Sequence, residues 1–501
     1  MKFKFFFGVI IGMTLIISAT ESIAVPTKGV KNPKTSTFRN LQKIIASVWI
    51  TTPDQSQLLN RQADLAFAPY RPTSKLLTIN VDEKQTFQQM DGFGASFTDS
   101  SAWLVYKKLT PLQRKELMVK LFDPVNGIGL SYLRQPMGSS DFSVQKHYTY
   151  NDSPNNLPDP ELKYFSIDYD RAYIIPVIKQ ALQINPKLKI MATPWSAPAW
   201  MKSNTSVIGG SLKPDAYQPY AQYFVKFIQA YAKEGITIDA VTVQNEPLHS
   251  PDNYPGMLMS PQQQIDFIKN HLYPAFLNAG IKTKIIAYDH NWDEVNYPLT
   301  ILSDSLVRSI ISGVSFHGYA GNVTAQTLVR NAYPDKGIYF TEVSGGGWAT
   351  NFASNLAWDV ENLIIGSTLN WSKTVVKWNM VLNENNGPYN GGCSNCRGVA
   401  TVNTNNGRID LNVEYYSLGH ASKFVSPGAY RIGTNILNSG KNPSVDSNAI
   451  KNVAFKNPDG SIAVIVFNST SSKKRFNIKS GIQAFSYTLE GGAVASFKFR
   501  A

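Results

Sequence analysis

The sequence predicts an α/β fold, a (β/α)8 TIM barrel with an attached antiparallel β-sandwich domain. Two observations lead to this prediction. From about residue 85, short apolar segments rich in β-branched residues alternate with helix-length spacers, and eight such segments precede residue 420. Beyond residue 420 the spacers disappear, and short strand-like segments follow one another with turn residues between them, as in an antiparallel domain.

The first 24 residues have the three parts of an export signal. Lys2 and Lys4 supply the positive charge, Phe5–Ile17 is an apolar core, and a small-x-small cleavage site ends at Ala24. The apolar core is short for a membrane span, so an uncleaved anchor is the minor alternative. We therefore expect an exported protein, periplasmic or secreted, whose signal peptide is cleaved near Ala24.

The remaining boundaries follow changes in composition. The segment after the signal is rich in Lys, Thr, Pro and Ser and is predicted to be disordered. The predicted organisation is a signal peptide at 1–24, a disordered leader at 25–39, strands joining the β-sandwich at 40–84, the barrel at 85–420 and the C-terminal β-sandwich at 421–501.

The chain is basic, with 48 Lys and Arg against 35 Asp and Glu and a formal net charge of +13. Such a protein could make transient contact with anionic membrane or polymer surfaces. A solvated basic face is the favoured alternative, because the excess charge is dispersed. No arginine-rich run or nucleic-acid fold signature is present, so nucleic acid is not an expected partner.

Each predicted barrel strand ends in polar or aromatic residues, and amphipathic segments such as Tyr217–Glu234 and Pro261–Ala279 predict helices between strands. The eight strands are expected at Phe87–Phe97, Ile128–Leu133, Leu188–Ala192, Ile238–Pro247, Lys284–Ala287, Gly313–Phe316, Gly337–Thr341 and Thr374–Val376. The sandwich strands are expected at Lys43–Thr51, Lys75–Val81, Asn452–Phe455, Ile462–Phe467, Phe476–Ile478, Phe485–Leu489 and Phe497–Phe499.

Two of these strands deliver a glutamate at the same kind of position. Glu246 follows the apolar run of the fourth strand and precedes Pro247, and Glu342 ends the seventh strand. Active sites of parallel barrels lie at the carboxyl ends of the strands. Capping of a helix would explain either carboxylate alone, but a pair fits a retaining glycosidase, with Glu246 as acid/base and Glu342 as nucleophile.

Aromatic residues follow the predicted strands, and sugars bind by stacking on aromatic rings. Burial in the core is the alternative for any single one of them. No cluster of histidines and carboxylates predicts a metal, since His317 stands alone, and no glycine-rich phosphate loop predicts a cofactor. Asp99 is expected to cap the helix that follows it. The aromatic residues predicted to form the rim are Trp195, Trp200, Tyr319, Trp348 and Trp378.

Two cysteines, Cys393 and Cys396, are the only ones in the chain. A structural zinc site would need further ligands, and a thioredoxin-type pair would follow a strand and open a helix. In an oxidising compartment, a disulfide that closes a small loop is the favoured interpretation.

Several of these motifs resemble glycoside hydrolase family 30, including the glucosylceramidases and their microbial β-1,6-glucanase relatives. The segments that carry the resemblance begin at about residue 85 and extend to the C-terminus. They include Asp91-Gly-Phe-Gly-Ala, Pro194-Trp-Ser-Ala-Pro-Ala-Trp-Met-Lys202, Asn245-Glu-Pro, Phe340-Thr-Glu342 and Trp378-Asn-Met-Val-Leu-Asn383. The resemblance implies a barrel with a β-sandwich that acts on β-glucosides with retention and without a metal.

The resemblance also implies roles for single residues. Glu246 matches the acid/base and Glu342 the nucleophile of the family. Gly318 stands where the glucosylceramidases carry a tryptophan, and the Cys393–Cys396 loop replaces a segment that reaches the sugar. The implied substrate-binding residues are Arg134, Asp141, Trp195, Asn245, Tyr319 and Trp378.

The sequence thus predicts an exported retaining β-glucosidase that cleaves a terminal β-glucosyl bond, with glucosylceramide preferred as substrate. The expected partner is a β-glucoside, either a glycolipid or a β-glucan. A β-1,6-glucanase of the same family is the alternative, and a catalytically inactive carbohydrate-binding barrel is the alternative of another class.

Overall fold

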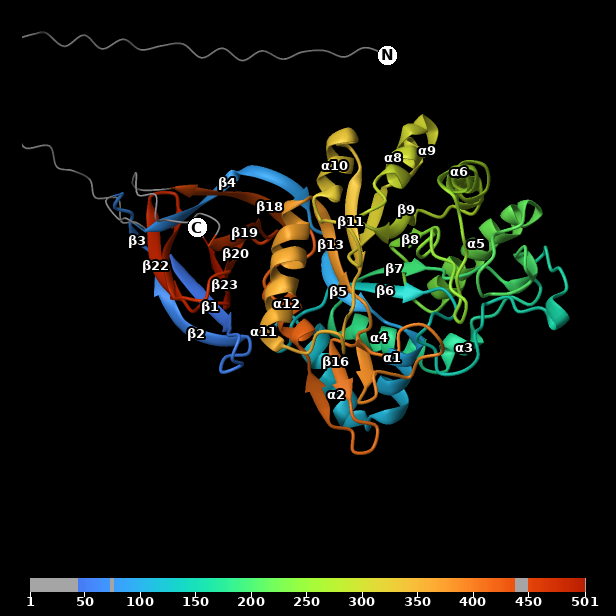
Figure 1. The fold of residues 1–501 in the computed structure, drawn as a ribbon, viewed down its shortest axis with the longest axis horizontal. Coiled ribbons are helices and arrows are strands. Elements are labelled where there is room, and N and C mark those ends of the chain that lie inside the picture. Colours follow the sequence, from blue (N-terminus) through green and yellow to red (C-terminus); the bar gives the residue numbers. More distant parts are fainter. Residues whose placement is uncertain (1–43, 73–75, 438–448, 501) are drawn as a thin grey trace, which may run out of the picture. The chain divides into compact units, whose positions relative to one another are not determined.

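A computed structural model describes residues 44–72, 76–437 and 449–500 (Figure 1). The predicted signal peptide, 1–24, and leader, 25–39, lie outside these ranges. Among the helices within them, none combines the length and the apolar character needed to cross a membrane.

The predicted barrel is confirmed. Eight parallel strands close into a ring in the order β10-β11-β13-β5-β6-β7-β8-β9, so each strand pairs with its neighbours in sequence and the last pairs with the first. The strands are β5 (Gly92–Ser96), β6 (Tyr132–Pro136), β7 (Lys189–Thr193), β8 (Ala240–Thr242), β9 (Lys284–Asn291), β10 (Gly313–His317), β11 (Gly337–Glu342) and β13 (Ser372–Lys377).

The second barrel strand along the chain, β6, begins later than predicted. The predicted strand Ile128–Leu133 starts in a loop, because the N–H groups of Ile128 and Leu130 donate to carbonyls of Lys120 and Leu121 rather than to a neighbouring strand. As a result Arg134 lies within β6 instead of beyond its end.

Helices fill the spacers between the barrel strands. The prediction at Tyr217–Glu234 corresponds to α5, and Pro261–Ala279 forms α6, a π-helical segment η5 (Phe267–Leu272) and α7. The helices are α1 (Asp99–Trp103), α2 (Pro111–Phe122), α3 (Asp168–Arg171), α4 (Ile174–Ile184), α5 (Tyr217–Lys233), α6 (Pro261–Asp266), α7 (Tyr273–Asn278), α8 (Asn296–Ser303), α9 (Ser305–Ile310), α10 (Ala325–Ala332), α11 (Phe352–Trp358) and α12 (Val413–Ser422).

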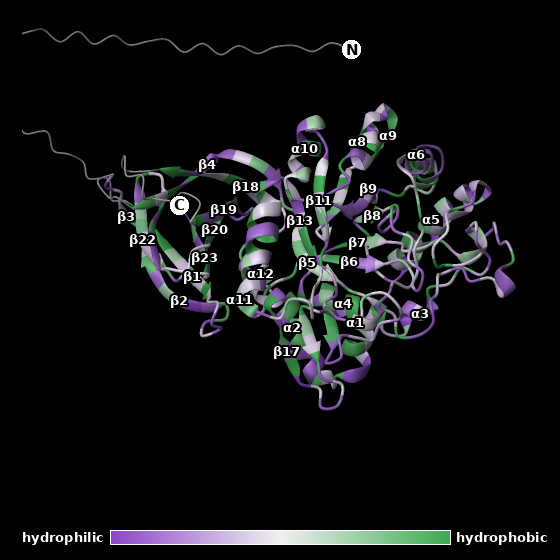
Figure 2. Cartoon of the chain, in the orientation of Figure 1, coloured by the Kyte–Doolittle hydropathy of each residue, from purple (hydrophilic) through white to green (hydrophobic). Residues whose placement is uncertain are grey.

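The inside of the barrel is filled by side chains rather than open. Tyr132, Met191, Ile286 and Tyr339 belong to one buried cluster contributed by different strands. Figure 2 shows the arrowhead of β6 in the hydrophilic colour, where Arg134 and its neighbours end the strand. Polar side chains therefore gather at the carboxyl-terminal mouth, above an apolar interior.

The second domain is a ten-stranded sheet in which strands that precede the barrel lie among strands that follow it. Its order is β2-β1-β23-β20-β19-β18-β4-β21-β22-β3. The sequence prediction missed β18, which pairs with β4. The strands are β1 (Ile45–Thr51), β2 (Asn60–Ala66), β3 (Ala68–Pro69), β4 (Leu77–Gln89), β18 (Tyr430–Leu437), β19 (Ile450–Lys456), β20 (Ser461–Asn468), β21 (Lys474–Ser480), β22 (Gln483–Leu489) and β23 (Val494–Arg500).

Short strands also order the loops at the mouth of the barrel. The strand β12 (Gly345–Gly346), just after β11, pairs with β15 (Cys396–Arg397). A three-stranded sheet of β14 (Val381–Asn383), β16 (Ala400–Val402) and β17 (Ile409–Leu411) flanks the segment that carries the two cysteines. The cysteine segment therefore lies between the paired strands β14 and β16, and its Cys396 end pairs with β12, just after β11.

Candidate active site

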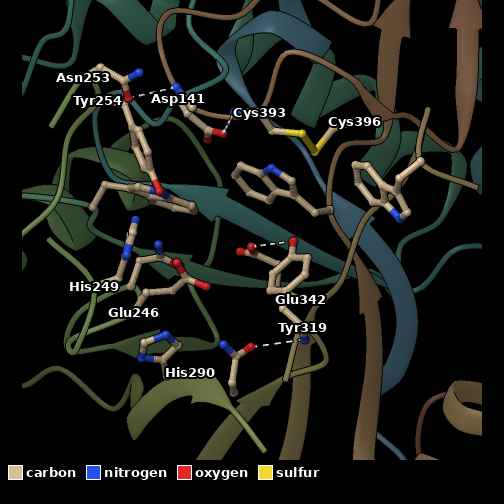
Figure 3. Close-up of a pocket in the computed structure, with 16 residues that line it drawn as sticks. Asp141, Glu246, His249, Asn253, Tyr254, His290, Tyr319, Glu342, Cys393 and Cys396 are labelled. Atoms are coloured by element: carbon tan, nitrogen blue, oxygen red, sulfur yellow. Dashed lines mark hydrogen bonds between the residues drawn. A yellow bond between two sulfur atoms is a disulfide. The ribbon is translucent and has the colours of Figure 1, made fainter. Parts of the chain in front are cut away.

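A cavity of about 530 Å³ lies at the carboxyl ends of the barrel strands (Figure 3). Its walls come from loops that follow several different strands, as in other parallel barrels. Of the predicted site residues, those that line it are Asp141, Trp195, Asn245, Glu246, Tyr319, Glu342, Trp378, Cys393 and Cys396. Arg134 does not line it, since its side chain is completely buried beneath the carboxylates.

Glu246 lies beyond the short strand β8, in a backbone conformation that few residues adopt. Its φ is 45°, in the left-handed region, and its N–H donates to the carbonyl of Asp289 at 3.0 Å. The N–H of Asn245 donates to the carbonyl of Pro194 at 2.9 Å. These bonds to β9 and to the loop after β7 hold a strained turn in place and aim the Glu246 carboxylate into the cavity.

Glu342 ends β11, and both of its oxygens accept hydrogen bonds. The Tyr319 hydroxyl donates to Oε1 at 2.9 Å, and Arg134 Nη1 donates to Oε2. Arg134 Nη2 also donates to Asn245 Oδ1 at 2.7 Å and to Asp289 Oδ2 at 2.9 Å. One guanidinium thus connects the strand ends that carry the two glutamates.

The structure adds Asp289, which the sequence analysis did not identify as a site residue. Besides Arg134, it accepts hydrogen bonds from Thr242 at 2.8 Å, Thr341 at 2.7 Å and Ser315 at 3.1 Å. Burial acts to raise the pKa of Asp289, but the charges of Arg134 and His317 hold it well below its usual range. A permanent negative charge therefore lies under the site and fixes Arg134.

His317 does not stand alone, since it lies between the carboxylates of Glu246 and Asp289. Its Nδ1 is 3.1 Å from Glu246 Oε1, and its Nε2 is 3.2 Å from Asp289 Oδ1. Burial acts to lower its pKa, but the charge of Glu342 and the contacts with Asp289 and Glu246 raise the pKa to about 9. His317 is therefore protonated at neutral pH and donates to the carboxylates of Glu246 and Asp289.

The two glutamates are close enough to titrate as a pair. Burial raises the pKa of Glu342, with His317 and Arg134 acting in the opposite direction. For Glu246, burial is outweighed by the hydrogen bond and charge of His317, which lower the pKa. A carboxylate oxygen of Glu246 and one of Glu342 lie within 4.8 Å of each other. This separation is near the roughly 5–5.5 Å of retaining glycosidases and below the range of inverting ones.

The aromatic prediction is correct for four of its five residues. The rings of Trp195 and Trp378 are stacked with centroids 5.0 Å apart, and both line the cavity together with Tyr319 and Trp348. Trp200 is in the core instead, where its Nε1 donates to Asn151 Oδ1 at 2.8 Å. A short 3₁₀ turn, Ala199–Met201, directs it away from the mouth.

Asp99 does not cap its helix, contrary to the prediction. Thr98 is the N-cap, and its hydroxyl accepts a hydrogen bond from the N–H of Ser101. Asp99 lies in the first turn, where it accepts hydrogen bonds from the hydroxyls of Tyr169 and Tyr173. Its role is therefore in the buried packing of α1 against α4, outside the cavity.

Asp141 and the cysteine segment form one end of the cavity. The two cysteines are joined by a disulfide. The Asn390 N–H donates to the Asp141 carbonyl at 2.7 Å, and the Cys393 N–H points to Asp141 Oδ2 at 3.5 Å. Gly392 has a φ of 63°, and a Cβ there would lie 2.5 Å from the Asp141 side chain. Burial raises the pKa of Asp141 to about 8, so its carboxyl can both donate to and accept from a hydroxyl.

We expect the disulfide to support sugar binding. Reduction, or replacement of both cysteines by serine, should loosen the wall against Asp141 and raise KM for a β-glucoside more than it lowers kcat. The measurement combines alkylation with mass spectrometry and steady-state kinetics on native and reduced protein. Two free thiols in protein purified without reductant, or identical KM values in both forms, would contradict this expectation.

The sequence predicts neither a metal nor a cofactor. In the described part of the chain, the side chains close enough to share an ion are Glu246, His317 and Glu342. A cation there would have to displace the proton of His317 and would face the guanidinium of Arg134. The arrangement of these three side chains therefore suits hydrogen bonding between His317 and the carboxylates better than binding of a metal ion.

Comparison with known proteins agrees with this geometry. The model of the glycosyl hydrolase family 30 TIM-barrel domain matches residues 90–425, and that of the family's β-sandwich domain matches 428–497. An endo-1,6-β-D-glucanase of Trichoderma harzianum is 34% identical over 417 residues, which cover 79% of this chain and 81% of that protein. The lysosomal acid glucosylceramidase of Mus musculus is 31% identical over 446 residues, 84% of this chain and 82% of that protein.

Among solved structures, that of an endo-β1,6-glucanase superimposes with a TM-score of 0.83 at 34% sequence identity. The match covers 91% of this chain and 99% of that one. The family models and this match therefore extend over both domains.

Proposed function

Because this chain belongs to glycosyl hydrolase family 30, we propose that it cleaves β-1,6-linked glucan with retention at the anomeric carbon. It is a glycoside hydrolase acting on O-glycosyl bonds, as its relatives are. The observation that carries the proposal is the pair of carboxylates, Glu246 and Glu342, within 4.8 Å across one cavity. Retention requires a nucleophile and an acid/base at about this separation.

Glu342 suits the nucleophile. Its two oxygens are held by Arg134, which keeps its proton, and by the Tyr319 hydroxyl, whose pKa is raised by burial of the hydroxyl end of this otherwise exposed ring and by the charge of Glu342. Neither donor is deprotonated at neutral pH, so both act against the burial that raises the pKa of Glu342. One oxygen then attacks the anomeric carbon, the bond to the leaving oxygen breaks, and a glycosyl ester on Glu342 forms.

Glu246 suits the acid/base by its position rather than by its pKa, which the hydrogen bond and charge of His317 lower. Within the described residues its side-chain hydrogen-bond partner is His317, itself titratable, and its carboxylate remains partly open to the cavity. A proton on Glu246 passes to the leaving oxygen in the first step. In the second step Glu246 takes a proton from water, which attacks the ester and frees Glu342.

The other predicted residues are placed to bind the sugar. The stacked rings of Trp195 and Trp378 offer an apolar face, and Asp141 closes the end of the cavity. Asn245, held by Arg134, can donate from its amide nitrogen to the hydroxyl next to the anomeric carbon. Arg134 acts through these residues as a positioning residue.

For the substrate we favour β-1,6-glucan over glucosylceramide, which revises the preference drawn from the sequence. Relatives named as endo-1,6-β-glucanases are found among curated proteins and among solved structures at 34% identity, against 31% for the lysosomal glucosylceramidase. Gly318 also has no side chain at the position where the resemblance implies a tryptophan in the glucosylceramidases.

The deciding experiment compares turnover of a β-1,6-glucan and detergent-dispersed glucosylceramide under identical conditions. Release of soluble sugar from the β-1,6-glucan with the lipid untouched is the expected result. Cleavage of the lipid alone would restore the glucosylceramidase interpretation. Failure to hydrolyse even an aryl β-glucoside would favour an inactive carbohydrate-binding barrel.

We also propose export, supported by the charged and apolar segments of residues 1–24. An exported protein reaches glucan outside the cell directly. Its net charge of +13 favours contact with anionic polymer surfaces there. N-terminal sequencing of secreted protein should begin near Val25.

A further inference from the structure

A second cavity of about 460 Å³ lies beside the active-site cavity and shares two of its walls, Tyr319 and Trp348. Its remaining lining comes from Gly318, from the loop after β11, from α11 and from the end of β13. The shared residues are 43% and 57% exposed, so they separate the cavities as an open rim rather than a buried partition.

The rings in this second cavity are unusual for their exposure. Among the described residues, the tryptophans exposed enough to count as surface residues are Trp348 and Trp358, and both line this cavity. Exposed indole rings outside a core offer flat apolar faces, and such faces stack against sugar rings. Gly318 adjoins these rings without a side chain, and a Cβ there would lie 3.1 Å from the buried ring of Phe340.

A buried ion pair forms the polar part of the same cavity. Lys377 Nζ donates to Asp359 Oδ1 at 2.8 Å, and the two side chains are 2% and 5% exposed. Asp359 also accepts from the Ser417 hydroxyl at 2.7 Å. Within the described residues this bond to Asp359 is the one hydrogen bond of the Lys377 ammonium group, which has three hydrogens to donate.

These features select an uncharged polyhydroxyl ligand. The ion pair is neutral overall, so it gives no advantage to a phosphate or carboxylate. An acyl chain would cover the pair without replacing any hydrogen bond, which is costly for buried charges. A sugar hydroxyl can accept from Lys377 while the sugar ring packs on an indole face.

The position of the cavity shows which sugar would occupy it. Asp141 lies across the active-site cavity from Tyr319 (Figure 3), so a chain longer than one glucose leaves past Tyr319 and Trp348. A 1→6 linkage inserts an exocyclic carbon between rings, and its additional rotatable bond lets the chain turn over such a rim.

We propose that this second cavity binds a glucosyl unit on the leaving-group side of the scissile bond, stacked on Trp358 and Trp348 and hydrogen-bonded to Lys377. The inference rests on the proposed β-1,6-glucanase function and identifies where the rest of the glucan lies during cleavage.

The test compares Trp358→Ala with wild type on two substrates. Trp358 is 40% exposed and lines the second cavity only, so its replacement leaves the catalytic machinery intact. β-Glucosyl fluoride reports on the chemistry alone, because fluoride reaches no further subsite. A β-1,6-linked glucotetraose reports on the additional rings. The matched control is Tyr164→Ala, an exposed aromatic outside both cavities.

The expected result is a loss of about tenfold in kcat/KM on the tetraose, the size of one lost stacking contact, with the fluoride rate unchanged. Trp358→Tyr, which keeps a ring, should recover most of that loss. Equal losses on both substrates, or no loss on the tetraose, would overturn the inference alone. Wild-type protein that hydrolyses the fluoride but no β-1,6 oligomer would overturn the proposed function first and the inference with it.

Discussion

Glu342→Ala is expected to abolish turnover of every substrate, from glucosyl fluoride to β-1,6-glucan. Without this carboxylate no glycosyl ester can form, and activated leaving groups cannot compensate because the missing group is the nucleophile itself. By analogy with other enzymes that lose their nucleophile, the loss in kcat should be on the order of 10⁵-fold or more. Steady-state kinetics on an aryl β-glucoside and on glucan measure it directly.

The control for this variant must separate lost chemistry from lost structure. Removal of Glu342 leaves Arg134 buried with one carboxylate fewer, which costs stability as well as activity. Glu342→Gln keeps the shape and can still accept from Arg134, yet it should be equally inactive. Glu161→Ala removes an exposed glutamate and should behave as wild type. Turnover by Glu342→Gln at more than about a hundredth of the wild-type rate would reject the nucleophile assignment.

The positions of the two glutamates could be predicted from the sequence because barrel geometry is repetitive. Every parallel strand ends at the same mouth, so a polar residue after an apolar run has a known destination. The predictions for Glu246 and Glu342 required only that their strands be recognised. The tight turn that actually holds Glu246, with a φ of 45°, was not needed to place it at the mouth.

Asp289 could not be recognised in the same way, because its importance comes from its partners. Its hydrogen bonds come from Thr242, Ser315 and Thr341, hydroxyl residues on three different strands that resemble ordinary strand residues in the sequence. The available signal was the polar run that follows the fifth barrel strand, of which Asp289 is the second residue. Only the closed barrel brings these groups together around one carboxylate.

Two further differences have the same origin. Trp195 and Trp200 lie in one short motif, and no local pattern indicates that a 3₁₀ turn sends the second into the core. The strand β18 was also missed, and it pairs both with β19, which follows it in the sequence, and with β4, which is more than 300 residues away. Local periodicity predicts an element, whereas its neighbours depend on contacts between distant segments.

Glu246→Ala should separate the two steps of the reaction. Substrates whose leaving group needs no proton should still glycosylate Glu342, whereas β-1,6-glucan, with an alkoxide leaving group, should react roughly 10²–10⁴-fold more slowly. Hydrolysis of the ester should then limit turnover of an aryl β-glucoside, because no base activates the water. A burst of the released phenol in rapid-mixing experiments measures this change in the rate-limiting step.

Azide distinguishes the two possible roles of Glu246 in the Glu246→Ala variant. A small anion can enter the space left by the Glu246 side chain and attack the ester without a general base, so azide should raise the steady-state rate and yield β-glucosyl azide. Two successive displacements at the anomeric carbon keep the β configuration. An α-glucosyl azide from Glu246→Ala would instead indicate a single displacement, and would mean that Glu246 is the nucleophile and Glu342 the acid/base. The same assay on Glu342→Ala should give the α product, so the pair of variants assigns both roles from the stereochemistry of one product.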